Sequence, residues 1–116
     1  MYLFDIPIFY KTIRMTLDEF RVCTRRNQPD QQLDEALTAL WHDAQDDWNK
    51  AHDIAQDMPT KDGSWIHAYL HRKEGDLSNA GYWYRKANRE IFEGTLEEEW
   101  EAMAQHFLKN NDSSIH

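Results

Sequence analysis

Apolar residues recur at helical spacing along most of the chain. Around residue 40 the apolar positions fall three and four residues apart, at Leu33, Leu37, Leu40, Trp41 and Ala44. This is the spacing of one face of an α-helix. Three later segments repeat it, with the apolar sets Trp48, Ala51 and Ala55; Leu77, Ala80, Tyr84 and Ala87; and Leu96, Trp100, Met103 and Phe107. No alternating strand pattern competes after residue 15, so the sequence predicts an all-α fold.

Capping and turn residues divide this pattern into about six helices. Thr16 with Glu19, and Thr95 with Glu98, form capping boxes in which each side chain can satisfy the other's backbone N–H. The predicted spans are 16–26, 30–45, 48–57, 64–73, 77–88 and from 95 onward, with 58–63 as the clearest loop. Because the connections are short, consecutive helices should pack as antiparallel hairpins.

The break between the fourth and fifth helices is the best defined. Gly75 can adopt the left-handed conformation that ends a helix, and Asp76 then provides the cap of the next helix. Ser64 is expected to cap the helix before this break. A tight helical hairpin is therefore predicted around residue 75.

The pattern predicts one domain with an appendage at each end. Residues 15–109 form the helical domain, which has the size of one ordinary folding unit. Residues 1–14 are apolar and β-branched around Pro7, so we expect an extended arm that docks on the helical body or on a second copy. Residues 110–116 form a polar tail that should fray.

Charge and composition narrow the classes of function. The net charge of −8 disfavours binding to nucleic acid and to an anionic membrane surface, and no apolar run reaches the length of a spanning helix. Cys23 is the single cysteine, which fits a reducing cytoplasm and a small buried side chain. Residues 30–62 hold nine acids and two lysines, whereas residues 65–90 hold five bases and three acids. This polarity could steer a partner or pair one subunit with another, but a solvated acidic helix beside a less acidic one is the favoured interpretation.

Two segments align with an offset of 29 residues. Residues 46–51 match residues 75–80, since each has a polar break, then an apolar residue, then an alanine three positions later. Such periodicity is typical of helical-repeat proteins, in which neighbouring hairpins stack. The second copy, from Ala68 through Gly75 and Asp76 to Tyr84 and Ala87, resembles a tetratricopeptide repeat, which implies stacked helical hairpins. Residues 67–76, His-Ala-Tyr-Leu-His-Arg-Lys-Glu-Gly-Asp, are also similar to a block in a group of small uncharacterised bacterial proteins, a resemblance that implies no reaction.

His67 and His71 lie four residues apart, so both side chains project from one face of the fourth helix. We expect at least one of them to be buried against the preceding hairpin. Such a pair can provide half of a metal site, with further ligands from His42, His52, Asp43 or Glu74. Packing and hydrogen bonding are the commoner role of paired helical histidines, so the expectation is that the protein binds no metal and no other cofactor.

Charged and aromatic residues surround the same hairpin. Arg72, Glu74, Asp76 and Arg85 suggest a salt-bridge set that holds the turn, with an anion pocket built from the two arginines as the alternative. Tyr82, Trp83 and Tyr84 point about 100° apart on a helix, so they cannot all face the core. If Tyr84 is inward, Tyr82 or Trp83 lies outward beside Arg85, as on a recognition surface, or is buried under another element.

Motifs of enzymes are missing from the sequence: it has no glycine-rich phosphate loop, no nucleophile elbow and no Cys-x-x-Cys pair. The sequence therefore favours a binding module over an enzyme, recognising a protein segment or a second copy of itself as a homodimer. The expected ligand-binding residues are His67, His71, Arg72, Tyr82, Trp83 and Arg85. The alternative is a protein or enzyme that binds a small molecule or a metal around His67, His71, Arg72 and Tyr82.

Overall fold

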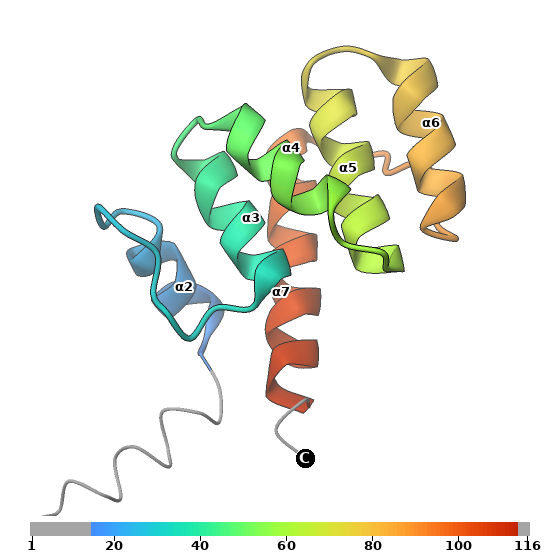
Figure 1. Cartoon of the computed structure of the whole chain (residues 1–116). Coiled ribbons are helices and arrows are strands. Elements are labelled where there is room, and N and C mark those ends of the chain that lie inside the picture. Colours follow the sequence, from blue (N-terminus) through green and yellow to red (C-terminus); the bar gives the residue numbers. More distant parts are fainter. Residues whose placement is uncertain (1–14, 114–116) are drawn as a thin grey trace, which may run out of the picture.

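The computed structural model describes residues 15–113 and, within that range, contains six α-helices and no strand. The helices are α2 (Leu17–Cys23), α3 (Glu35–Ala44), α4 (Trp48–Gln56), α5 (Lys61–Lys73), α6 (Leu77–Lys86) and α7 (Leu96–Ser113) (Figure 1). The predicted all-α fold is confirmed. The predicted arm of residues 1–14 lies outside the described residues.

The helices form two hairpins that share one supporting helix. α3 packs on α4, α4 packs on α5, and α5 packs on α6. α7 contacts α2, α3 and α5, so it holds the row together from one side (Figure 1). α6 packs chiefly on α5 and forms the edge of the row. The largest side chains that are completely buried come from five helices: Phe20, Leu37, Leu40, Ile66, Leu70, Tyr84, Met103 and Phe107.

The 29-residue repeat is visible in the backbone of the two hairpin turns. The left-handed residue is Asp46 in the first turn, with φ 62°, and Gly75 in the second, with φ 88°. In each turn the following aspartate donates its N–H to a histidine carbonyl five residues earlier, His42 or His71, at 2.9 Å. The same aspartate then caps the next helix with its carboxylate. The turns are therefore equivalent, while the resemblance to a tetratricopeptide repeat stays a prediction.

The first two helices are shorter than predicted. Asp34, rather than Asp30, caps α3, because its carboxylate accepts the Leu37 N–H at 2.9 Å. The Asp30 carboxylate instead accepts the Gln32 N–H at 2.9 Å and closes a local turn. α2 stops at Cys23 rather than at residue 26, since the chain tightens there into turns with hydrogen bonds three residues apart.

The start of α5 was also predicted wrongly. The helix begins at Lys61, inside the predicted loop, and Thr60 rather than Ser64 caps it by accepting the Gly63 N–H at 3.1 Å. A Cβ on Gly63 would lie 2.6 Å from the Cβ of Met58. The glycine therefore belongs to a helical turn packed tightly on the chain that leaves α4, rather than to an open loop.

Capping boxes and turn signals placed other boundaries correctly. Both predicted boxes form, with Thr16 and Thr95 each exchanging hydrogen bonds with the glutamate three residues later. α6 ends at Lys86, two residues before the predicted end, and α7 continues to Ser113, so residues 110–113 of the predicted tail belong to the helix.

Two side chains depart from the predicted faces. Leu77 and Ala44 were placed on core faces, yet Leu77 is 68% exposed and Ala44 is also exposed, while Asp43 is buried. Both misplaced residues lie at a helix end beside a tight turn, where periodicity alone does not decide which side chain faces inward. Cys23 is buried, as predicted.

Candidate functional site

The structure divides the six predicted site residues among three places. His67 and His71 lie on the buried side of α5, and Arg72 on the same helix reaches α7. Tyr82 and Arg85 lie on the exposed side of α6, whereas Trp83 is half-buried between these regions.

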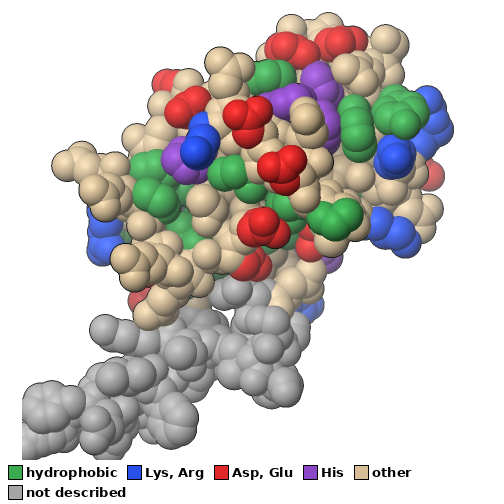
Figure 2. All heavy atoms as spheres, viewed as in Figure 1, with side chains coloured by type: hydrophobic (Ala, Val, Ile, Leu, Met, Phe, Trp, Pro, Cys, Tyr) green, Lys and Arg blue, Asp and Glu red, His purple; other side chains and the backbone are tan. Residues whose placement is uncertain are grey.

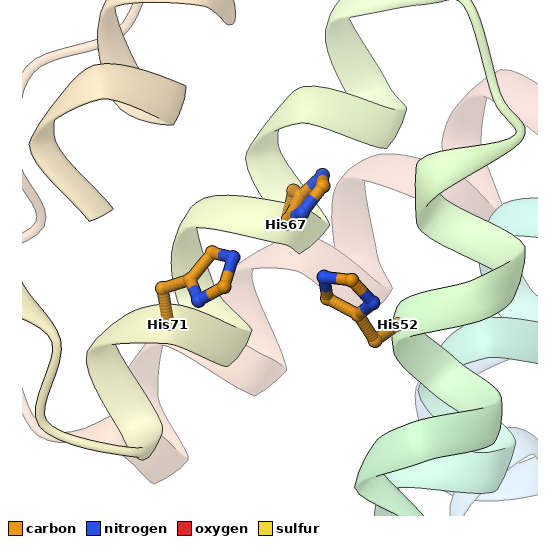
Figure 3. A group of neighbouring side chains, drawn as sticks. All are labelled: His52, His67 and His71. Carbon is orange, nitrogen blue, oxygen red and sulfur yellow. The ribbon is translucent and has the colours of Figure 1, made fainter. Parts of the chain in front are cut away.

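A cluster of three histidines occupies the space between α4 and α5. His67 and His71 are 4% and 7% exposed, as expected for a pair packed against the preceding hairpin. His52 of α4 joins them, and each histidine offers a ring nitrogen that lies within 4.8 Å of the other two. Figure 3 shows the three rings facing one another across the α4–α5 gap. His52 was one of four further candidates from the sequence; His42 and Asp43 belong to no such group among the described residues.

Two tryptophans form walls of this histidine cluster. The Trp83 ring stacks on His67, with centroids 3.8 Å apart and an interplanar angle of 12°. The Trp48 ring stacks on His52 at 4.8 Å and 12°, and its indole N–H donates to the Leu70 carbonyl at 2.8 Å. The histidines therefore lie in a largely apolar, aromatic surrounding.

Hydrogen bonds satisfy this cluster only in part. His71 Nδ1 lies 2.7 Å from a Glu74 carboxylate oxygen, and His71 Nε2 lies 3.4 Å from the Asn79 side-chain nitrogen. His67 Nδ1 is buried and has no hydrogen-bond partner in the described part of the chain. A buried polar atom without a partner is uncommon and costly in proteins.

The surroundings keep His67 neutral. Burial, together with the nearby His52 and His71 rings, lowers the pKa of His67 to about 4. Burial, followed by the charge that His71 carries when protonated, also lowers the pKa of His52. At neutral pH the His67 ring therefore has one nitrogen with a free lone pair, the form that can accept a proton or bind a metal.

Arg72 does not join the predicted salt-bridge set around the turn. Its guanidinium donates to Glu99 of α7 at 2.8 Å and to the Gly94 carbonyl. Glu74 pairs with His71 instead. Arg72 is therefore unavailable to an anion pocket shared with Arg85, and the predicted ion network was wrong in its partners.

Glu99 is the main residue that sequence reasoning missed. It is completely buried and accepts hydrogen bonds from the Trp65 indole at 3.0 Å and the Tyr84 hydroxyl at 2.6 Å, in addition to Arg72. The signal was present in the sequence, because residue 99 lies on the same helical face as Leu96 and Met103. However, three consecutive glutamates at 97–99 are typical of an exposed, solvated surface, which hid the inward position of the third.

A hollow of about 390 Å³ lies where α2, α3, α5 and α7 meet, beside Tyr69 and Trp100. Asp43 lines it and accepts hydrogen bonds from the Tyr69 hydroxyl and the Lys73 ammonium, each at 2.8 Å. Its buried carboxylate is thus already paired, and these hydrogen bonds tie α3 to α5 beside the hollow.

α6 carries two exposed large apolar side chains, Leu77 at its first turn and Tyr82 beside cations on its outer side. Leu77 and Tyr82 are 68% and 47% exposed. The Lys86 ammonium lies 5.8 Å from the Tyr82 ring centroid and 5.4 Å from that of Trp83. Arg85 is exposed and has a guanidinium nitrogen next to Gly81. Figure 2 shows green hydrophobic atoms beside blue cationic ones on the side where α6 lies, and red carboxylates over the α3–α4 side.

Comparison of the chain with protein-family models, with characterised proteins and with solved structures finds no match. Among the described residues, no helix is both long enough and apolar enough to cross a membrane. Arguments about function therefore rest on the arrangement of the side chains.

Proposed function

We propose that this protein is a small helical binding module that recognises a segment of another protein through the outer side of α6. The observation that carries the proposal is the grouping there of exposed Tyr82 and half-buried Trp83 with Lys86, whose ammonium lies 5.8 and 5.4 Å from the two ring centroids. Aromatic and arginine side chains, here the exposed Tyr82 and Arg85, are enriched at recognition surfaces.

The position of α6 in the row of helices supports this proposal. In stacked helical hairpins, the last helix usually presents a polar outer face to water. α6 is the edge helix, yet its outer side exposes Tyr82, and Leu77 is exposed at its first turn. A partner helix that packs where a next hairpin would stack would cover Tyr82.

The charges of α6 favour an acidic amphipathic helix as the partner. Arg85 and Lys86 flank the exposed apolar residues, whereas the acids of the chain concentrate in residues 30–62. In Figure 2 the red carboxylates lie over the α3–α4 side, beside rather than on α6. A second copy brings a net charge of −8, which opposes self-association, so we favour a segment of another protein, in the reducing cytoplasm that the lone cysteine suggests.

A binding assay with designed peptides tests the proposal. Fluorescently labelled amphipathic helical peptides, one acidic and one with every acid replaced by lysine, are titrated with the full chain while anisotropy is followed. The acidic peptide should bind, binding should weaken with salt, and Leu77→Ser combined with Tyr82→Ser should weaken it at least tenfold. Ile91→Ser is the matched control, since Ile91 is similarly exposed outside α6.

Two outcomes would contradict the proposal. One is binding of the acidic peptide that survives the double substitution. The other is a dimer in light scattering that Leu77→Ser and Tyr82→Ser convert to monomer, which would assign this surface to a second copy.

A further inference from the structure

We infer that His52, His67 and His71 form a binding site for one divalent late transition-metal ion, with Zn²⁺ as the reference ion. Imidazole nitrogens are the preferred donors for zinc, copper and nickel, and three histidines are an established set of protein ligands for zinc that leaves a further position open. The site lies between α4 and α5, and its assignment does not depend on the outer side of α6.

Geometry is the first argument. His67 and His71 project from one face of α5, and His52 approaches from α4, so three donors converge from two helices (Figure 3). Two nitrogens bound to one tetrahedral zinc lie roughly 3.4 Å apart at ordinary Zn–N distances. The three nitrogens already lie within 4.8 Å of one another, so closure requires movements of ~1.4 Å or less per pair, which small side-chain rotations supply.

The unpartnered nitrogen of His67 is the second argument. Within the part of the chain that the structure describes, its Nδ1 is buried and has no hydrogen-bond partner, and the residue is only 4% exposed. The three rings contact one another edge to face or stacked, at centroid distances of 4.4, 4.9 and 5.3 Å. Such contacts leave the nitrogen unsatisfied, so packing alone does not explain an imidazole there. A bound cation would supply the missing partner.

Glu74 is the third argument. Metal-binding histidines commonly donate their other ring N–H to a carboxylate, which orients the ring and increases its basicity. His71 Nδ1 lies 2.7 Å from Glu74 Oε2, which makes Nε2 the metal-binding nitrogen of that ring. Asn79, at 3.4 Å from this nitrogen, would give way to the ion. Glu74 and Asp76 also place carboxylate oxygens near His71, where they offset the charge of a cation held by neutral ligands.

Calorimetric titration of the full chain tests the site. After dialysis against a chelator and then into chelator-free buffer, the protein is titrated with Zn²⁺, and Co²⁺ is used for visible spectra that report coordination geometry. We expect one ion per chain with micromolar or tighter affinity, and ¹⁵N-imidazole resonances of three histidines that shift together. His52→Asn and His71→Asn should each weaken binding at least tenfold, and Glu74→Gln should weaken it about 10- to 100-fold.

His42→Asn is the matched control. His42 occupies the position in the first hairpin turn that His71 occupies in the second, yet it lies outside the cluster, so its substitution should leave the affinity unchanged. His52 is partly exposed, which makes His52→Asn the variant expected to fold normally, and circular dichroism verifies this. Zn²⁺ should raise the melting temperature of the original chain but not that of His52→Asn.

The inference is overturned if the chain binds no ion more tightly than millimolar, or if binding persists when all three histidines are replaced by asparagine in a folded variant. Equal loss of affinity in His42→Asn and His71→Asn would likewise contradict it, because binding would then follow histidine content rather than the cluster.

Discussion

Removal of the buried Glu99 carboxylate should destabilise the fold more than removal of any other charged side chain in α7. The carboxylate is completely buried and accepts hydrogen bonds from Trp65, Tyr84 and Arg72. It thereby joins α5, α6 and α7 at one point. In Glu99→Ala all three donors lose their acceptor.

The magnitude follows from the partners that remain. A buried donor left without an acceptor costs ~1–3 kcal/mol, and both the Trp65 indole and the Tyr84 hydroxyl would be in that position. The Arg72 guanidinium is 18% exposed, so water relieves part of its loss. We therefore expect Glu99→Ala to lower the free energy of unfolding by ~3–5 kcal/mol, the range for breaking a buried ion pair. Glu99→Gln keeps the volume and one acceptor oxygen, so it should cost about half as much.

Urea denaturation followed by circular dichroism measures this effect. Glu97→Gln is the control, since Glu97 lies on the exposed side of the same helical turn and should change the stability by less than ~0.5 kcal/mol. Tyr84→Phe combined with Glu99→Gln should cost less stability than the sum of the two single changes, because both affect the same hydrogen bond between Tyr84 and residue 99. A Glu99→Ala protein as stable as Glu97→Gln would refute the reasoning.

Further predictions concern three glycines and the pH dependence of stability. Gly75→Ala should cost about 1 kcal/mol, because φ is +88° there and only the conformation, not a clash, opposes a side chain; no change in the urea midpoint would disagree. Gly63→Ala should cost ~1–3 kcal/mol, since its Cβ would meet Met58 at 2.6 Å. Gly81→Ala should be neutral or stabilising by up to ~1 kcal/mol, because its Cβ would meet only the Arg85 guanidinium, at an ordinary contact of 3.7 Å; the reverse order in thermal unfolding would contradict the packing described. In the metal-free protein, the pKa of His67 is about 4, against 6.5 in an unfolded chain. Between pH 6.5 and pH 4 the unfolded chain therefore binds one more proton, on His67, than the folded protein does. The free energy of unfolding should consequently fall by ~2–3 kcal/mol as the pH decreases from above 6.5 to 4. His67→Phe should remove this pH-dependent decrease in the free energy of unfolding. If both proteins lose stability identically as the pH decreases, His67 is not its source.

The sequence by itself determined the features that depend on neighbouring residues. Helical periodicity indicated the all-α fold, the Thr16 and Thr95 capping boxes form as expected, and Gly75 ends α5 with positive φ. The offset of 29 residues also identified two turns with matching backbone conformation. Each of these rests on interactions within a few residues, which the order of the residues specifies directly.

Sequence reasoning failed where a local choice had two acceptable answers. Asp30 and Asp34 can each cap a helix, as can Thr60 and Ser64, and in both pairs the packing of the hairpins selected the residue. Leu77 was placed inward by periodicity, yet no helix covers it at the edge of the row.

Only the tertiary structure decided which polar residues meet. His52 joins His67 and His71 because α4 packs on α5. Arg72 pairs with Glu99 rather than with Glu74, which is nearer in the sequence, because α7 packs against α5. The helical pattern states which side of a helix is buried, but not which helix lies against it. Contacts between residues distant in the sequence depend on how whole apolar faces fit together, and that fit is a property of the assembled core rather than of any segment.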